Sequence, residues 1–397
     1  MRTKASTGTP YRPPDQLTAR MEPLMSRIER FWLRVSDGLK VDQLWKQFQA
    51  DARASYRLYS ADVDASSSAG VPKWKHYLRL AGQFFWAVME KLSPARRVLL
   101  LVALVFMFAP SGQATWERDG GGTTVLSFDN HFWGAALLLL ILVLEVSDRV
   151  VMKRDLQIAK EIQTWLLPPA APSVPGLEIA FATRPANTVA GDYYDVFPRV
   201  CGDAHPETFL IAVADVAGKS IPAALLMATV QASLKTLAPT PLSMTELVER
   251  MNQYACTNSQ NGRRFTTAFV AEFDAQARSL TYVNAGHNPP ILRRASGMVE
   301  RLEAGGIPLG ILDSPAYASA TVKLEPQDWV VLFSDGVIEA ENARSQEYGE
   351  DRLLYQIHAG AAQSPPMLLQ RIMGDIDQFV GTASQHDDVT CMLLKAV

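Results

Sequence analysis

The chain has 397 residues, of which 48% are hydrophobic and 20% are charged, so a disordered chain and a small disulfide-stapled peptide are both excluded. The charge is unevenly divided: residues 1–97 contain 17 basic and 9 acidic residues, whereas residues 98–397 contain 21 basic and 32 acidic ones. An acidic C-terminal portion argues against nucleic-acid binding there, and three cysteines without a paired spacing are typical of a reducing compartment.

Residues 1–94 are predicted to form a helical cytoplasmic and juxtamembrane region. Apolar residues recur at near-helical spacing between Leu17 and Tyr59. Lys73–Leu92 mixes basic and aromatic residues, which suits a helix lying in a membrane interface, and a helix packed on another helix is the alternative. We find no chemistry-bearing motif here, and the role of residues 1–72 stays open.

Two apolar runs predict a two-helix transmembrane hairpin over residues 95–147. Val98–Ala109 contains twelve residues and Phe132–Leu144 thirteen. Both are shorter than the roughly 20 residues of a usual span, so a pair of buried core helices is the alternative. The hairpin requires the first helix to extend through Pro110–Ala114 and the second to begin near Val125. Basic residues flank the pair on its outer sides, which predicts a multi-pass protein of the inner (cytoplasmic) membrane with its N-terminus and its C-terminal domain in the cytoplasm.

Residues 148–169 are predicted to form a helical linker that ends before Pro168 and Pro169, since proline cannot continue a helix. One face of this linker is apolar, with a seven-residue recurrence. Such a face could form the seam of a parallel homodimer or could dock on the following domain. The face contains Val151, Ile158, Ile162 and Trp165.

Residues 170–397 show short apolar runs separated by turn residues, with helical patterns in the middle and near the end. This order predicts an α+β domain. The predicted strands are Leu177–Ala182, Phe209–Ala214, Thr267–Phe273, Leu280–Asn284, Ile291–Arg293, Trp329–Phe333 and Val389–Leu394. The predicted helices are Ile221–Leu237, Met244–Asn258 and Pro366–Phe379.

Acidic residues stand at the ends of predicted strands or in glycine turns: Asp192, Asp215, Asp335, Asp387 and Asp388. Carboxylates gathered at strand ends repel one another unless a cation neutralises them, and oxygen ligands favour Mg²⁺ or Mn²⁺ over Zn²⁺. Two such ions about 4 Å apart would activate water for attack on phosphorus. An aspartate before glycine at the end of a strand is most often an ordinary turn residue, so each one alone is weak evidence, and the spacing does not prove that they converge.

Two other interpretations of this region are weaker. Gly218-Lys219-Ser220 opens a helix after a strand, as a phosphate-binding loop would, but Val213 stands where that loop needs glycine. Ser334 beside Asp335, together with His287 in Ala285-Gly286-His287-Asn288, could indicate the nucleophile and base of a hydrolase, but no GxSxG turn is present. We therefore predict that His287 is structural or lies behind the site.

From about Arg154 to Val397 the sequence resembles the SpoIIE-type, or RsbU-like, branch of the metal-dependent PPM protein phosphatases. The resemblance rests on linker residues AKEIQ (159–163) and LLP (166–168), followed by AGDYYD (190–195), DVAGKSIPAALLMA (215–228), FTTAFVAEFD (265–274), YVNAGHNPPIL (282–292), GGIPLGIL (305–312), FSDGVIEAEN (333–342) and HDDVT (386–390). One departure is Ala190, which replaces the first glycine of the usual Gly-Gly-Asp and could stiffen the loop that carries Asp192.

This resemblance implies a central antiparallel β-sandwich flanked by helices, with a two-metal site at one end. The implied ligands are Asp192 and the Val216 carbonyl for the first ion, Asp215 as the bridge, and Asp335 and Asp387 for the second. Asp388 could replace Asp387, because the doubled aspartate leaves the register uncertain by one. The helices after Gly218 and from Met244 resemble the family's switch helices, which would receive signals through the linker.

We therefore predict a membrane-anchored phosphoserine/phosphothreonine protein phosphatase that acts in signal transduction and uses two Mn²⁺ or Mg²⁺ ions. Its catalytic residues would be Asp192, Asp215, Asp335 and Asp387. The resemblance implies a phosphorylated protein substrate such as an anti-sigma-factor antagonist. The alternative is a membrane-tethered sensory or scaffold protein whose phosphatase-like domain is weakly active or inactive.

Overall fold

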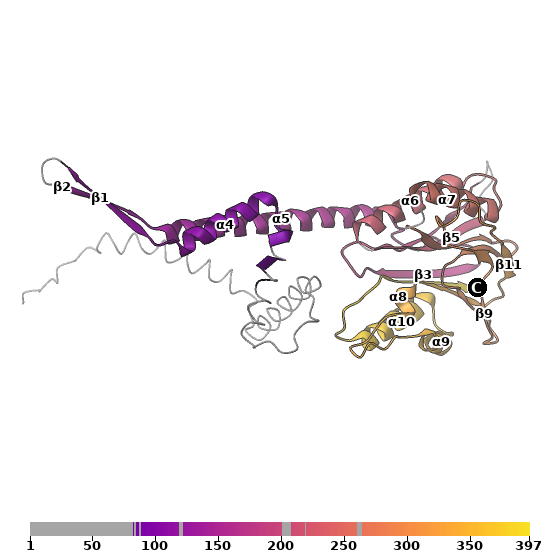
Figure 1. Cartoon of the computed structure of the whole chain (residues 1–397). Helices are drawn as coiled ribbons and strands as arrows, with labels where there is room; N and C mark the ends of the chain where they lie inside the picture. Colours follow the sequence, from indigo (N-terminus) through magenta and orange to yellow (C-terminus); the bar gives the residue numbers. More distant parts are fainter. Residues whose placement is uncertain are drawn as a thin grey trace, which may run out of the picture. The chain divides into compact units, whose positions relative to one another are not determined.

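The computed structural model describes residues 82, 85–86, 89–118, 122–200, 208–218, 220–259 and 264–397. The chain divides into two compact units, Met1–Glu145 and Val146–Val397, and Figure 1 shows the elements of both. The helical pattern of residues 1–72 and most of Lys73–Leu92 lie outside the described residues.

The first unit contains a pair of helices connected by a β-hairpin. Its elements are α4 (Pro94–Phe108), β1 (Gly112–Arg118), β2 (Gly122–Phe128) and the first part of α5 (Asn130–Leu166). The two helices approach closely at Gly134, where a Cβ atom would lie 3.1 Å from the carbonyl oxygen of Ala103. Arg96 and Glu145 form an ion pair at 3.1 Å between the other ends of the pair.

The predicted transmembrane hairpin is not supported by this unit. Over the described ranges, no helix has both the length and the apolar character that crossing a membrane requires. The extension of the first helix through Pro110–Ala114 is wrong, because Ala109 before the proline is extended and α4 ends at Phe108. The start of the second helix near Val125 is also wrong, because Val125 lies in β2.

The predicted linker (residues 148–169) continues, without a break, the helix that contains the second apolar run (Phe132–Leu144). α5 is 37 residues long and ends at Leu166, just before the two prolines. Its last part, from Val146 on, belongs to the second unit.

Two sheets form the centre of the second unit. The first contains β4 (Tyr193–Pro198), β5 (Thr208–Val216), β6 (Thr266–Asp274), β7 (Ser279–Ala285), β10 (Gly305–Gly306) and β11 (Ala320–Lys323). Its order is β10-β7-β6-β5-β4, with β11 also paired to β7. The second contains β3 (Leu177–Arg184), β8 (Ile291–Arg293), β9 (Val299–Arg301), β12 (Trp329–Phe333) and β13 (Val389–Ala396), in the order β3-β13-β12-β8-β9. Except for the short β10–β7 pair, all strand pairs within the described ranges of these sheets are antiparallel, so the predicted antiparallel sandwich is confirmed.

Helices cover the outer face of each sheet (Figure 1). Helices α6 (Ile221–Leu237) and α7 (Met244–Asn258) share an apolar core with the first sheet. Helices α9 (Glu350–Ala359) and α10 (Pro365–Val380), with the short α8 (Asp335–Ile338), pack on the second. The bounds of α6 and α7 are those predicted. The start of α7 is fixed by a capping box between Ser243 and Glu246.

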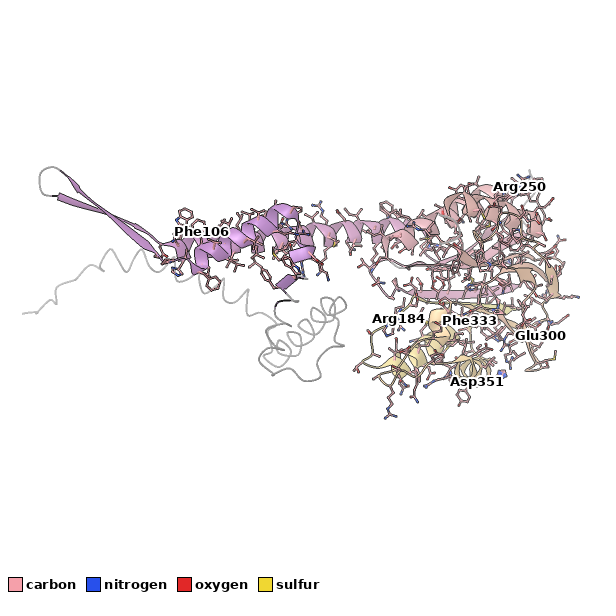
Figure 2. All side chains as sticks on the ribbon, viewed as in Figure 1. Phe106, Arg184, Arg250, Glu300, Phe333 and Asp351 are labelled. Atoms are coloured by element: carbon pink, nitrogen blue, oxygen red, sulfur yellow. The ribbon has the colours of Figure 1, made fainter. Side chains whose placement is uncertain are left out.

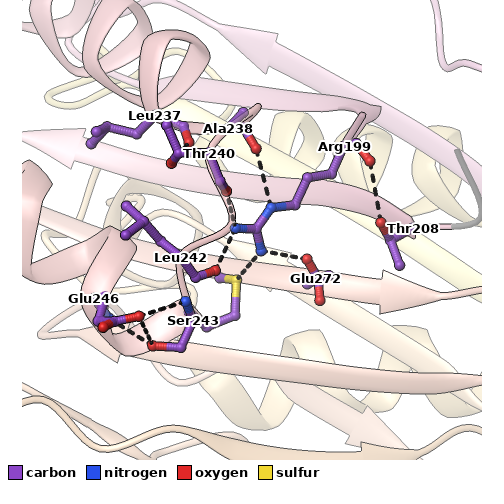
Figure 3. A network of polar contacts seen from close by, with 10 residues as sticks. Arg199, Thr208, Leu237, Ala238, Thr240, Leu242, Ser243, Glu246 and Glu272 are labelled. Atoms are coloured by element: carbon purple, nitrogen blue, oxygen red, sulfur yellow. Dashed lines mark hydrogen bonds and ion pairs between the residues drawn. The ribbon is translucent and has the colours of Figure 1, made fainter. Parts of the chain in front are cut away.

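A buried arginine joins the α6–α7 loop to the first sheet (Figure 3). The Arg199 side chain is 5% exposed and forms an ion pair with Glu272 of β6. It also donates hydrogen bonds to the carbonyl oxygen of Ala238, which directly follows α6, and to those of Thr240 and Leu242 in the loop between α6 and α7. The guanidinium, which has five N–H donors, therefore ties this loop to the sheet.

Candidate active site at one end of the sandwich

The core between the two sheets changes from apolar to polar at one end. Alternate residues of each strand face this core, and most of them form one apolar cluster. Six strands each carry a polar residue two positions beyond their last residue in this apolar cluster. These polar residues are Asp192, Asp215, Thr267, Asn284, Ser334 and Thr390. β3 and β12 both pair antiparallel with β13, so their last residues, Arg184 and Phe333, mark this end in Figure 2.

The first sheet brings Asp192 and Asp215 together. Tyr193 lies opposite Ala214 in the antiparallel pairing of β4 with β5, so the next step of the register puts Asp192 opposite Asp215. Burial raises the pKa of Asp192 well above its usual value, and the neighbouring charge of Asp215 raises it further. These are two carboxylates in one poorly solvated space.

The second sheet places two more carboxylates near Asp215. Burial raises the pKa of Asp215 to about 7, and the charges of Asp335 and Asp387 are the next largest causes. Asp335 is the first residue of α8, directly after β12, and Asp387 precedes β13. The four predicted catalytic aspartates therefore lie at the same end of the sandwich, two beside each sheet.

A glycine allows the two carboxylate-bearing segments of the second sheet to approach. A Cβ atom on Gly336 would lie 2.2 Å from the carbonyl oxygen of Asp388. Ser334, which is fully buried, ties the same segments together. Its hydroxyl donates to the Asp388 carbonyl at 3.0 Å and accepts from the backbone N–H of Thr390 at 3.0 Å.

The two adjacent aspartates before β13 have different surroundings. The Asp388 carboxylate accepts hydrogen bonds from the backbone N–H groups of Ala186 at 2.7 Å and Gly191 at 2.6 Å. Asp387 is partly exposed and lines a pocket of about 210 Å³ that Gly336 also lines. Asp388 therefore binds the loop that precedes Asp192. Asp387, whose Oδ1 atom accepts from the backbone N–H of Asp388 at 2.9 Å, lines the pocket instead.

The residues fit a divalent cation by their chemistry. Among the residues with described positions, no three His, Cys, Asp or Glu side chains converge closely enough to enclose an ion. The donors are nevertheless all oxygens, which suit Mg²⁺ and Mn²⁺. Asp192 is 2% exposed, and its Oδ2 atom is buried without a hydrogen-bond partner. Such an orphaned oxygen is costly to bury unless something binds it. The predicted Val216 carbonyl lies nearby, 3.2 Å from where a Cβ on Gly191 would be.

His287 lies behind the four carboxylates and does not join them. Its Nδ1 atom is 3.0 Å from the hydroxyl of Thr267, which lies opposite Asp215 in the β5–β6 pairing. Complete burial lowers the pKa of His287 to about 4, so the ring is neutral at pH 7. The Asn284 side chain fixes the turn by accepting from the His287 backbone N–H at 2.7 Å.

Several polar residues of this end were not identified from the sequence, among them Thr267, Thr390 and Gln163, and Ser334 was considered only as a hydrolase nucleophile. A signal for Thr267, Ser334 and Thr390 was present. Each stands two positions from an apolar residue on the inward face of a strand, where alternation predicts another apolar side chain. A polar residue at such a position marks the end of an apolar core.

Comparison with known proteins gives consistent matches. The profile of the family described as Stage II sporulation protein E (SpoIIE) matches residues 205–397. Phosphoserine phosphatase RsbU of Bacillus subtilis is 30% identical over 247 residues, which cover 62% of this chain and 70% of RsbU. Protein IcfG of Synechocystis is 25% identical over 275 residues, covering 62% of this chain and 42% of IcfG. Among solved structures, the SiaA-PP2C domain of Pseudomonas aeruginosa superimposes with a TM-score of 0.55 at 20% identity, covering 63% of this chain and 99% of that domain, which supports the fold.

The neutral state of His287 predicts a pH dependence of stability. Because its pKa falls from 6.5 to about 4 on folding, the unfolded chain binds a proton in this range that the native state does not. Stability should therefore fall as the pH falls from about 6.5 to about 4, by about 3 kcal/mol in total for this group. The measurement is urea unfolding of wild type and His287→Gln, followed by tryptophan fluorescence. The other titrating groups cancel in the difference between the two proteins, and a difference independent of pH would contradict the assignment.

Proposed function

The chain belongs to the SpoIIE-type, RsbU-like branch of the PPM phosphatases and is a metal-dependent serine/threonine protein phosphatase. On this premise we propose that Asp192, Asp215, Asp335 and Asp387 together bind the two divalent cations of its active site. The observation that carries this proposal is the buried Oδ2 atom of Asp192, which has no hydrogen-bond partner and lies at the end of the sandwich where carboxylates of both sheets stand. The raised pKa of Asp215, to which the charges of Asp335 and Asp387 contribute, supports it. Like charges brought together by two separate sheets are typical of a cation site.

Within the proposed site the four carboxylates have distinct environments. Asp215 is acted on by the carboxylates of both sheets, which suits a ligand shared by two ions. Asp192, with its buried orphaned oxygen, suits the first ion together with the Val216 carbonyl. We assign Asp335 and Asp387 to the second ion. Asp388 would position the loop instead, because backbone N–H groups already bind its two oxygens.

Bound Mn²⁺ or Mg²⁺ ions would activate water and neutralise charge on the transferring phosphoryl group. Ser334 and His287, the two residues that a serine-hydrolase mechanism would use here, are not arranged for covalent catalysis. The hydroxyl of Ser334 is fully buried and used in two backbone hydrogen bonds, so it is unsuited to attack a phosphoryl group. His287 is neutral and buried behind the site, so it is unsuited to protonate a leaving group. We therefore propose direct hydrolysis without a phosphoenzyme.

The proposed substrate is a phosphoserine- or phosphothreonine-bearing signalling protein. The description of RsbU as a phosphoserine phosphatase supports this class, and the family resemblance favours an anti-sigma-factor antagonist. The pocket beside Asp387 opens next to the carboxylates and offers space for residues that flank the phosphorylated side chain.

We further propose that the first unit attaches the protein to the cytoplasmic membrane, with the N-terminus and catalytic domain in the cytoplasm. The support is the large apolar side chains exposed on α4 and on the first part of α5. Examples are Val105 at 68%, Phe108 at 83%, Phe132 at 63% and Leu139 at 61% exposure. Apolar surface of this extent is unusual in a monomeric soluble protein and typical of a membrane or protein contact.

We also propose a homodimer formed through the last part of α5. All four residues of the predicted seam are exposed apolar side chains: Val151 at 54%, Ile158 at 45%, Ile162 at 48% and Trp165 at 79%. A parallel pairing of two such helices would bury them against their counterparts.

Asp335→Asn should reduce Mn²⁺-dependent hydrolysis of an aryl phosphate by at least about 100-fold, because it removes a charged ligand of the proposed second ion. The matched control is Asp351→Asn, an exposed aspartate of α9, which should hydrolyse like the wild type. Near-normal turnover by Asp335→Asn would contradict the site. A folded wild type that binds Mn²⁺ but does not hydrolyse phosphate would favour the scaffold alternative.

Membrane attachment predicts that the expressed chain stays in the membrane pellet after a carbonate wash. The double variant Val105→Lys and Leu139→Lys should move into the soluble fraction, since charged side chains are costly in hydrocarbon. Tyr355→Lys with Met367→Lys, at exposed positions of the catalytic domain, serves as the control and should stay in the pellet. Release of the wild type by the wash would contradict the proposal.

If the protein is a homodimer, sedimentation of the wild type in detergent should give twice the mass of one chain. Ile158→Glu should yield monomers, because it places two like charges opposite each other in the seam, whereas Met367→Glu should not. A monomeric wild type, or an Ile158→Glu variant that stays dimeric, would exclude this seam.

A further inference from the structure

The loop that precedes Asp192 is bound directly by the linker helix. The Gln163 side chain on α5 donates from Nε2 to the carbonyl oxygen of Ala190 at 2.6 Å. It also accepts, at Oε1, the backbone N–H of Ala190 at 2.9 Å. One side-chain amide thus satisfies both backbone groups of a residue two positions before a proposed metal ligand.

The burial of Gln163 runs against the pattern of its helix. Gln163 is 6% exposed, whereas the apolar Ile162 and Trp165 beside it are 48% and 79% exposed. A surface helix normally buries its apolar side chains and exposes its polar ones. The hydrophobic effect therefore does not explain why this amide is buried, and its two hydrogen bonds to Ala190 do.

Other elements fix the same loop on its remaining sides. The Asp388 carboxylate binds the backbone N–H of Gly191 at 2.6 Å. Gly191 itself packs against α6, where an added Cβ would lie 3.4 Å from the Cβ of Ala223 and 3.2 Å from the carbonyl oxygen of Val216. The Gln163 amide is thus one of the contacts that hold the backbone directly before Asp192.

We propose that Gln163 is a positioning residue that sets the metal affinity of the site by fixing the backbone before Asp192. This inference rests on the proposed function, since it requires Asp192 to bind a cation. It gives α5 a direct route to the site that does not pass through α6 and α7. A turn or shift of the end of α5 would break both hydrogen bonds at once and leave two buried backbone groups of Ala190 unpaired.

The test compares Mn²⁺ binding to the whole chain in three proteins, using electron paramagnetic resonance of free Mn²⁺. In Gln163→Leu both hydrogen bonds are lost while size and helix propensity are kept. Gln157→Leu is the matched control, because Gln157 is an exposed glutamine on the same helix. Loss of a partner that orients a metal ligand lowers affinity by about 10- to 100-fold. We therefore expect a shift of at least 10-fold for Gln163→Leu and none for Gln157→Leu.

Hydrolysis of an aryl phosphate separates positioning from a structural role. At saturating Mn²⁺ the kcat of Gln163→Leu should return to within about threefold of wild type, because all proposed ligands are present. Gln163→Glu, which keeps the acceptor for the Ala190 N–H but loses the donor to its carbonyl, should also bind Mn²⁺ more weakly. If Gln163→Leu does not fold, Gln163→Glu serves as the test variant in its place.

The outcomes separate the two proposals. Equal Mn²⁺ affinity in wild type and the Gln163 variants would overturn the role of Gln163, and so would a lowered melting temperature with unchanged affinity. Failure of wild type to bind Mn²⁺ would overturn the proposed metal site itself, and with it this inference.

Discussion

The burial of like-charged carboxylates where two sheets meet is the constraint on which the rest of this domain depends. Two unit charges 4 Å apart repel by about 4 kcal/mol at an effective dielectric constant of 20, and burial adds a desolvation cost. The pKa values of Asp192 and Asp215 are raised for these reasons. The strand register and the close approach at Gly336 hold these carboxylates at the same end of the sandwich. A bound cation would turn this repulsion into attraction.

Much of the fold could be predicted from the sequence, and the errors have physical causes. Helices α6 and α7 have the predicted bounds because their apolar periodicity and flanking turns are unambiguous. Strand β4 was not among the predicted strands, since a charged residue, Asp195, interrupts its apolar pattern. That carboxylate is accommodated by an ion pair with Lys235 of α6 at 2.8 Å. The hairpin β1–β2 was missed because the two apolar runs around it favoured longer helices.

The candidate site also contains residues that could be predicted from the sequence and residues that could not. The aspartates could be singled out because strand ends and glycine turns are visible in sequence, and the structure places all four at one end of the sandwich. The groups that hold them in place were not, because those hydrogen bonds join residues far apart in the chain. Gln163 is 27 positions from Ala190, and Asp388 is 197 positions from Gly191. The choice between Asp387 and Asp388 also required knowing which carboxylate the loop backbone already binds.

Anomalous diffraction from crystals of the protein grown with Mn²⁺ would test the central claim most directly, because it locates the ions without reference to activity. The account predicts two anomalous peaks at the polar end of the sandwich. Both would lie within ligand distance of Asp215, one shared with Asp192 and the other with Asp335 and Asp387. Peaks elsewhere, or none at this end in crystals that contain bound Mn²⁺, would contradict the assignment of these carboxylates as the metal site.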